Sequence, residues 1–208
     1  MAKLVLTTFL TLDGVMQAPG GPDEDREDGF AHGGWLFPFA DDEEFGALMD
    51  GVLGRAGAFL LGRRTYDIFA GYWPKVTDPA DPIAAPLNAL PKYVASTTLR
   101  EAAWYNTTVL TGAAPGGLVA EVAALKERLG DTEIQIHGSG ALARVLMPHG
   151  VIDEYHLVTA PVRLGTGHRL FPEAGPPTAF RLTGTRTTPS GITAHTYRPT
   201  GPARFGTL

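Results

Sequence analysis

The sequence predicts an α/β fold of three layers, in which a mainly parallel central sheet lies between helices and ends in an antiparallel hairpin at its C-terminal edge. Two observations carry this prediction. Apolar, strand-like segments alternate with helix-like segments along most of the chain, and only strand-like segments remain near its end. No internal repeat or linker divides the 208 residues. We therefore expect one domain over residues 1–200 and a short tail over residues 201–208.

The first quarter of the chain predicts one strand, a long loop and one helix. The strand is expected over residues 3–12, where apolar residues and β-formers precede the turn dipeptide Asp13-Gly14. Loops longer than about 12–15 residues are usually functional or disordered. The loop over residues 17–39 exceeds that length, and its aromatic side chains predict that it packs against the domain: Phe30, Trp35, Phe37 and Phe39. A helix capped by aspartates is expected over residues 41–53.

The middle of the chain predicts three short strands. An apolar strand over residues 58–61 runs into Gly62 and a short helix that ends near Gly71. Residues 77–91 are rich in proline and are expected to be irregular. Further strands are expected over residues 92–96 and 107–110.

The last part of the chain predicts two more helices and a closing hairpin. The remaining elements are expected in the order helix 118–129, strand 134–137, helix 141–149, strand 152–162, and hairpin strands 179–187 and 192–198. Gly130 and Gly150 stand where helix-ending glycines are common.

Composition excludes several classes of protein. The absence of cysteine excludes a disulfide scaffold, thiolate-bound zinc and a cysteine nucleophile. None of the six histidines has the spacing of a metal-binding pair, so no metal site is expected. No apolar run is long enough to span a bilayer, and the first ten residues lack the layout of a signal peptide. We expect a soluble, cytoplasmic protein that does not bind a membrane.

Charge is distributed unevenly along the chain. Residues 23–50 hold ten acidic residues and one basic residue, whereas the rest holds twelve acidic and sixteen basic residues. No basic cluster is present, so a nucleic-acid partner is not expected. A small phosphorylated ligand is compatible with the mildly basic part. The acidic stretch is itself explained by a solvated loop and helix face.

The segment Gly138-Ser139-Gly140-Ala141 lies between a predicted strand and a predicted helix. It fits the pattern G-x-G-x-x-A, in which glycines let the backbone approach a phosphate at a helix N-terminus. A plain tight turn is an equally good interpretation of the motif alone. Only 65 residues follow Ala143, which is too few for this motif to open a complete dinucleotide-binding domain.

Three other strand ends carry polar turns. Gly62-Arg63-Arg64-Thr65 combines a glycine turn with two guanidinium groups, and Ser96-Thr97 places hydroxyls after the strand at 92–96. Leu12-Asp13-Gly14, followed by Gln17, ends the first strand. Each of these segments can also be interpreted as an ordinary turn. Because ligands bind at the carboxyl ends of parallel strands, however, these turns support one another.

Taken in order, these motifs resemble a known family. The segments that carry the resemblance are Thr11-Leu12-Asp13-Gly14, Leu60 to Tyr66 with Trp73-Pro74, Ser96 to Leu99, His137 to Gly140, and Leu164 to Phe171. The chain resembles the dihydrofolate-reductase-like superfamily, specifically the reductase domain of the bifunctional deaminase-reductase of riboflavin biosynthesis. The resemblance covers about residues 3–198.

The resemblance implies an NADPH-dependent reductase that acts on a small molecule and forms a homodimer. It assigns cofactor binding to Leu12, Gly14, Gly62, Arg63, Arg64, Thr65, Ser96, Thr97, Gly138, Ser139, Gly140 and Ala141. It places Asp13 near the nicotinamide as the candidate catalytic, proton-handling group. Gln17, Trp35, Phe37 and Phe39 are the candidate substrate contacts.

Two departures from the family pattern narrow the function. In dihydrofolate reductase an acidic residue lies about 16 residues before the G-R turn, and here that position is Gly46, so folate reduction is not expected. The zinc deaminase half of the bifunctional enzyme is also absent from the sequence. The expected reaction resembles that of 5-amino-6-(5-phosphoribosylamino)uracil reductase. The alternatives are another carbonyl or pterin-like substrate, another electron carrier, or a regulatory dinucleotide-binding module without turnover.

Overall fold

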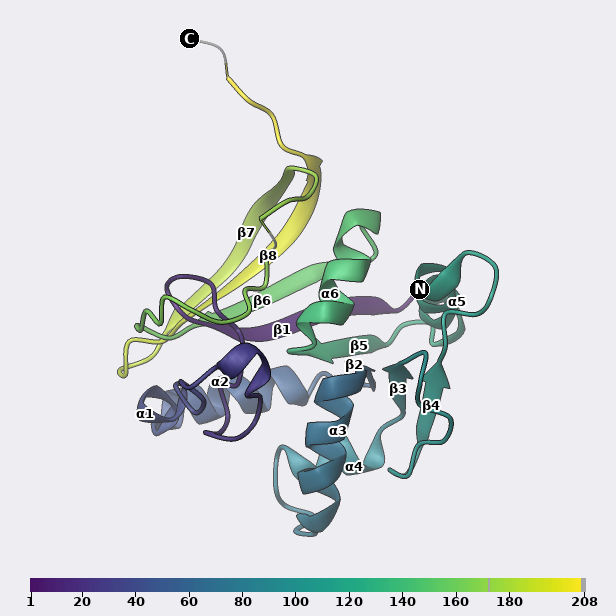
Figure 1. Cartoon of the computed structure of the whole chain (residues 1–208), viewed down its shortest axis with the longest axis horizontal. Helices are drawn as coiled ribbons and strands as arrows, with labels where there is room; N and C mark the ends of the chain where they lie inside the picture. Colours follow the sequence, from purple (N-terminus) through teal and green to yellow (C-terminus); the bar gives the residue numbers. More distant parts are fainter. Residues whose placement is uncertain (172, 207–208) are drawn as a thin grey trace.

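The computed structural model describes residues 1–171 and 173–206, which form one eight-stranded sheet in the order β4-β3-β2-β5-β1-β6-β8-β7 (Figure 1). The first six strands in that order are parallel, while β8 runs antiparallel to both β6 and β7. The strands are β1 Lys3–Leu10, β2 Ala58–Gly62, β3 Lys92–Ala95, β4 Thr107–Leu110, β5 Glu133–His137, β6 Glu154–Thr159, β7 Thr178–Thr187 and β8 Thr193–Pro202. The predicted parallel sheet with an antiparallel C-terminal edge is confirmed.

Helices cover both faces of the sheet, which gives the predicted three layers. They are α1 Phe37–Ala40, α2 Glu43–Leu53, α3 Arg63–Tyr72, α4 Ala84–Ala89, α5 Gly117–Arg128 and α6 Gly140–Leu146, with 3₁₀ turns η1 Glu27–Gly29, η2 Trp73–Lys75 and η3 Met147–His149. The helices α5 and α6 pack on one face, where Val122, Leu125 and Leu146 join Leu6 and Ile136 in a buried core. The other face packs against α2, α3 and α4.

Burial on both faces explains why β1 is so apolar. Its burial pattern is nearly continuous, as expected for a strand covered by helices on both sides. In contrast, most residues of β7 are exposed, because this strand lies at the edge of the sheet. Among the described residues, no helix combines the length and the apolar composition needed to cross a membrane.

Two sequence predictions require correction. Residues 77–91 are not wholly irregular, because α4 forms over Ala84–Ala89 after Asp81, whose carboxylate accepts from the N–H groups of Ile83 and Ala84. Burial of Leu87 against the core outweighs the local prolines. The helix predicted over residues 141–149 ends at Leu146 and continues as the 3₁₀ turn η3, because Pro148 has no N–H to continue the α-helical ladder.

Strand bounds differ from the predictions by a few residues at several ends. The largest difference is in β8, which continues to Pro202 because pairing with β7 extends to the register Thr178–Pro202. The strand predicted over residues 152–162 is limited to Glu154–Thr159.

The long loop before α2 packs on the domain, as its aromatic residues predict. Phe30 and Trp35 are buried, Phe39 is partly buried against the same cluster, and Phe37 remains exposed. The Trp35 indole donates a hydrogen bond of 2.7 Å to the carbonyl of Gln17, which joins the two ends of the loop.

Candidate active site

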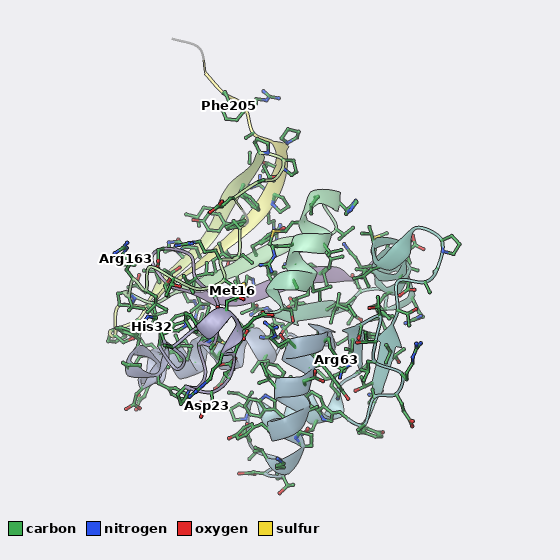
Figure 2. All side chains as sticks on the ribbon, in the orientation of Figure 1. Met16, Asp23, His32, Arg63, Arg163 and Phe205 are labelled. Atoms are coloured by element: carbon green, nitrogen blue, oxygen red, sulfur yellow. The ribbon has the colours of Figure 1, made fainter. Side chains whose placement is uncertain are left out.

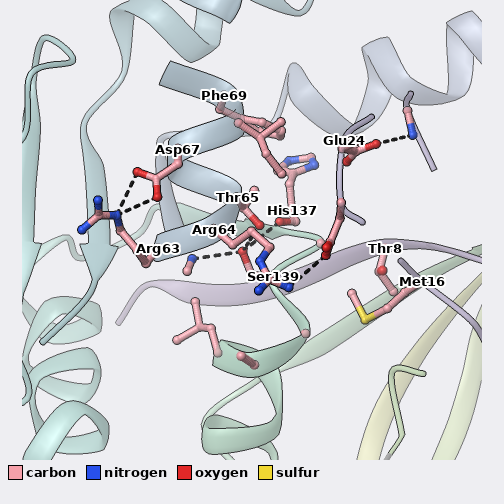
Figure 3. Close-up of a pocket in the computed structure, with 18 of the residues that line it drawn as sticks. Thr8, Met16, Glu24, Arg63, Arg64, Thr65, Asp67, Phe69, His137 and Ser139 are labelled. Atoms are coloured by element: carbon pink, nitrogen blue, oxygen red, sulfur yellow. Dashed lines mark hydrogen bonds and ion pairs between the residues drawn. The ribbon is translucent and has the colours of Figure 1, made fainter. Parts of the chain in front are cut away.

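A cleft of about 1260 Å³ opens at the carboxyl ends of the parallel strands (Figure 3). The turns that follow β2, β3 and β5 all line it, and the loop after β1 closes its other side. The sheet order places β2 between β3 and β5, so these three turns are neighbours in space although they lie far apart in the sequence. The predicted meeting of turns at one edge of the sheet is therefore present.

A direct contact joins the turns after β2 and β5. Ser139 Oγ accepts a hydrogen bond of 3.0 Å from the Gly62 N–H and lies 2.9 Å from Thr65 Oγ1. A Cβ at Gly62 would lie 3.4 Å from Ser139 Cβ and Oγ, so a glycine suits this close approach. The G-R turn and the G-S-G turn therefore form one continuous wall.

The backbone of this wall includes the starts of α3 and α6. Gly138 and Ser139 both adopt left-handed conformations, and they turn the chain directly from β5 into α6. The first N–H groups of α3 and α6 have no partner within their helices. Two short helix starts that share Ser139 therefore direct hydrogen-bond donors toward the cleft.

Two arginines of α3 point in different directions from this wall. Arg63 Nε lies 2.8 Å from both carboxylate oxygens of Asp67, one turn further along α3. Arg64 lies toward the loop after β1, as Figure 3 shows. Arg63 follows Gly62, whose neighbour across the β2–β3 ladder is Ala95, so Arg63 lies on the side of Ser96.

The acidic loop reaches Arg64 from the opposite side of the cleft. The Arg64 guanidinium is 2.9 Å from Asp25 Oδ2 and also pairs with Glu27. These carboxylates raise the pKa of Arg64 above its usual range, and the hydrogen bond from Arg64 lowers the pKa of Glu27. His168 Nε2 lies 2.9 Å from Asp28 Oδ2 and ties the same loop to the segment before β7.

The inner half of the cleft differs from this polar wall. Side chains of α2, of α3 and of the segment from η2 to α4 make it apolar: Phe45, Met49, Leu53, Phe69, Trp73, Ile83 and Leu87. Polar side chains of two neighbouring strands, Thr7 and Thr8 of β1 and His137 of β5, also line the cleft. The arginines that line the cleft (Arg63, Arg64 and Arg144) belong to the first two turns of α3 and α6.

Asp13 lies outside the residues that line the cleft. Its carboxylate accepts hydrogen bonds from Thr11 Oγ1 at 2.6 Å, from the Gly165 N–H at 2.8 Å and from the Leu164 N–H at 3.2 Å. These donors lower the pKa of Asp13 to about 2, with the Thr11 hydroxyl making the largest contribution. With this pKa the Asp13 carboxylate is ionised at neutral pH, and its hydrogen bonds join the chain after β1 to the Leu164-Gly165 turn.

The other predicted site residues divide between the cleft and its surroundings. Those that line it are Gln17, Phe37, Gly62, Arg63, Arg64, Thr65, Ser96, Thr97, Gly138, Ser139, Gly140 and Ala141. Those outside its lining, besides Asp13, are Leu12, Gly14, Trp35 and Phe39. Leu12 is 68% exposed, and Gly14 with φ of +77° forms the turn that Asp13 stabilises.

Gln17 holds the loop after β1 in place. Its side-chain nitrogen donates to the Glu27 carbonyl and its side-chain oxygen accepts from the His168 N–H. Its neighbour Met16 lies beside the start of α6 (Figure 2), where a Cβ at Gly140 would be 2.7 Å from Met16 Sδ. The loop is thereby positioned across the cleft from α3.

Sequence reasoning missed Thr7, Met16, His137 and the α2 side chains as cleft residues. His137 immediately precedes Gly138, so its place before the motif was a usable signal. The face of the sheet on which its side chain lies could not be predicted from the sequence, because α2, which packs on that face, lies more than 80 positions earlier in the chain. Among the described residues, no group of three or more histidines and carboxylates is arranged to hold a metal ion.

The mixed sheet, its antiparallel C-terminal edge and the cleft at the parallel strand ends define an α/β protein of the dihydrofolate-reductase-like fold. Residues 2–194 match the model of the RibD C-terminal domain, and the chain belongs to that family. Because the match covers nearly the whole chain, it spans every turn that forms the cleft.

Similarity to individual proteins is consistent with membership of this family. The chain is 26% identical to the uncharacterized protein YyaP of Bacillus subtilis (strain 168) over 205 residues, which is 96% of each chain. A putative riboflavin biosynthesis protein from Shewanella sp. PV-4 superposes with a TM-score of 0.64 at 22% identity, covering 96% of this chain and 99% of that one.

Two further solved structures share the fold. A dihydrofolate reductase from Enterococcus faecalis, complexed with NADP(H), has a TM-score of 0.59 at 14% identity and covers 95% of this chain and 96% of that chain. RibD from Acinetobacter baumannii has the same TM-score at 17% identity, and the match covers 96% of this chain but 58% of that longer chain.

Proposed function

We propose that this protein is an NADPH-dependent reductase of a small heterocyclic substrate. The observation that carries the proposal is the convergence of the turns after β2, β3 and β5 on one cleft in a member of the RibD C-terminal domain family. The cofactor supplies hydride chemistry, and the protein holds the cofactor and an acceptor molecule together while excluding water.

The residues present fit a dinucleotide phosphate. The N–H groups at the starts of α3 and α6, with the hydroxyls of Thr65 and Ser139, are suited to a pyrophosphate. Arg63 lies on the side of Ser96 and Thr97, and these three side chains would hold the 2′-phosphate that distinguishes NADPH from NADH. Arg64 lies on the side of the acidic loop and would contact the pyrophosphate.

The residues around Asp13 would position the nicotinamide end of the cofactor. With a pKa lowered to about 2, the Asp13 carboxylate holds no proton near neutral pH. We therefore propose that Asp13 is a positioning residue that fixes the turn containing Leu12 and Gly14, and we do not assign it a proton-transfer step. Gln17 and Phe37 would contact the substrate directly, while Trp35 and Phe39 would support the loop from beneath.

The charge distribution favours an uncharged heterocycle as substrate. The arginines of the cleft belong to the proposed cofactor wall, and the inner half is lined by apolar side chains with Thr7 and His137. The substrate that family resemblance implies is a ribosylamino-pyrimidine phosphate. Its phosphate would need a cationic side chain in addition to the arginines that bind the cofactor. A pyrimidine or pterin-like ring without that phosphate matches the inner half better.

Cofactor titrations of the Arg63→Ala and Arg64→Ala variants test the proposal. We expect the wild-type protein to bind NADPH and enhance its fluorescence. Arg63→Ala should lower the affinity for NADPH by about tenfold or more and leave the affinity for NADH nearly unchanged, because a charge-assisted hydrogen bond contributes about 1.5–3 kcal/mol. Arg64→Ala should lower the affinities for NADPH and NADH by a similar factor. Arg181→Ala, on the exposed edge strand β7, is the control and should change neither affinity.

Other outcomes would point to the rival functions. Failure of the wild-type protein to bind NADPH at millimolar concentrations would refute the proposal. Binding of NADPH without its oxidation by any ketone, pyrimidine or pterin would identify a binding or regulatory module. A yellow chromophore that copurifies with the protein would identify another electron carrier.

We also propose that the protein is a cytoplasmic homodimer. The edge strand β7 leaves Leu182 half exposed, and nearby Phe171 is 46% exposed. Sedimentation equilibrium measures the assembly directly, and a mass of 22.1 kDa in solution would indicate a monomer.

A further inference from the structure

The acidic loop after β1 is held against the wall of the cleft by one arginine. Arg64 of α3 lies 2.9 Å from Asp25 Oδ2 and also pairs with Glu27, and all three residues line the cleft. Figure 3 shows the Arg64 side chain directed toward the loop that carries Glu24. The Asp25 side chain is only 13% exposed. In the free protein, two carboxylates therefore occupy the position at Arg64 that we propose for a cofactor phosphate.

The charge of this loop opposes its compact arrangement. Residues 23–28 carry five carboxylates and one guanidinium. Burial, together with the neighbouring Asp25 carboxylate, raises the pKa of Glu24 above its ordinary value. Like charges this close repel one another, so the segment needs cations from other parts of the chain to stay in place. Arg64 of α3 supplies one of them, and His168 pairs with the far end of the loop.

The backbone is strained at both ends of the same loop. Ala18 with φ of +49° and Asp28 with φ of +54° adopt the left-handed conformation, which residues other than glycine rarely adopt. Such strain persists only where surrounding contacts fix it, and it is common in segments that switch between arrangements. Gln17 fixes the base of the loop by accepting a hydrogen bond of 3.0 Å from the His168 N–H. The loop therefore has two fixed ends, while its middle is held by Arg64.

Arg64 differs in this respect from the other two arginines that line the cleft. Arg63 pairs with Asp67, one turn further along α3, and Arg144 donates a hydrogen bond of 3.1 Å to the carbonyl of Arg169. Within the part of the chain that the structure describes, neither of them forms an ion pair with the acidic loop. The contact is thus specific to Arg64, the arginine to which we assign the pyrophosphate.

We propose that residues 20–27 form an autoinhibitory segment, in which Asp25 and Glu27 take the place of a ligand phosphate at Arg64. A phosphate that binds Arg64 displaces these carboxylates, and the segment then leaves the wall of the cleft because its charges repel the phosphate and one another. The contact favours ligands with several negative charges, since a weakly charged ligand cannot displace two carboxylates. The inference rests on the proposed function, because the displacing phosphate is that of the proposed dinucleotide.

Hydrogen exchange measured by mass spectrometry on the full chain tests whether Arg64 holds the segment. In Arg64→Gln the amides of residues 20–27 should exchange about tenfold faster than in the wild-type protein, because two ion pairs are lost. Arg63→Gln is the matched control. Arg63 lies in the same turn of α3 but pairs with Asp67, so this variant should leave the exchange of residues 20–27 unchanged. Equal exchange in Arg64→Gln and the wild-type protein would overturn the inference.

A second measurement uses the wild-type protein and saturating NADPH. We expect NADPH to slow exchange in residues 138–142, where it would bind, and to speed exchange in residues 20–27 toward the rate in Arg64→Gln. Slower exchange in residues 138–142 without faster exchange in residues 20–27 would overturn the autoinhibitory contact and leave the proposed reductase intact. No change in either segment would refute the reductase. Inorganic pyrophosphate, tested in parallel, then decides the contact: faster exchange in residues 20–27 supports it, and unchanged exchange overturns it.

Discussion

The buried imidazole of His137 should make the stability of the protein fall as the pH is lowered below about 6.5. Its pKa falls from the ordinary 6.5 to about 4 because burial disfavours the charged ring and His156 lies nearby. Between these values the unfolded chain binds a proton that the folded protein does not, so the free energy of unfolding decreases as pH decreases. Once the pH is below both pKa values, the free energy of unfolding has fallen by about 3.4 kcal/mol, and about 2 kcal/mol of this loss has occurred by pH 5.

Urea unfolding at pH 7.5 and pH 5 measures this loss. His156 also has a lowered pKa and contributes in the same pH range, so the contribution of His137 is isolated by comparison with His137→Phe. The variant keeps an aromatic ring beside Phe59 and cannot titrate. We expect it to be less stable at pH 7.5, because Gln135 loses its partner, but to lose about 2 kcal/mol less than the wild-type protein on going to pH 5. Equal losses in the two proteins would refute a neutral, buried His137.

Two further predictions concern the acidic loop and a glycine beneath it. Replacing Asp25 with Asn and Glu27 with Gln together should tighten NADPH binding several-fold by isothermal titration calorimetry, because Arg64 would no longer be neutralised before the cofactor binds; unchanged or weaker binding would show that these carboxylates do not compete with it. Gly167→Ala should lower the free energy of unfolding by about 2–4 kcal/mol, because φ is +109° and a Cβ would lie 2.7 Å from the ring of Phe30. The control Gly165→Ala, with nothing nearer than 4.0 Å, should cost about 1 kcal/mol, and equal losses would rule out the steric explanation.

The sheet was largely predictable because its signals are local. The apolar run over residues 58–61 identifies β2, and the alternation of Ile134 and Ile136 with polar residues identifies β5. Both segments end in glycine turns, so neither prediction needs any knowledge of neighbouring strands. The helix α4 was missed because its stability depends on the burial of Leu87, a tertiary contact that outweighs its proline-rich surroundings. Propensity is a weak guide wherever packing of this kind decides the outcome.

The candidate site was predictable in part for the same reason. The turns at Gly62 and Gly138 carry their own signal, and parallel strand ends meet at one edge of the sheet. Asp13 carried a local signal as well, but its carboxylate bonds to residues 164 and 165, about 150 positions away. No spacing rule indicates such a partner, so its environment could not be inferred.

By itself, the sequence determined the α/β class, the glycine turns at the strand ends and the pattern of segments that resembles the reductase family. Only the tertiary structure decided the electrostatic state of the site. Arg64 is neutralised by Asp25, which lies 39 residues earlier in the chain, and the Gln135 side chain that contacts the His137 ring is held by a carbonyl of α2. Secondary structure follows from neighbours in the chain, whereas charge, protonation and hydrogen-bond direction follow from neighbours in space.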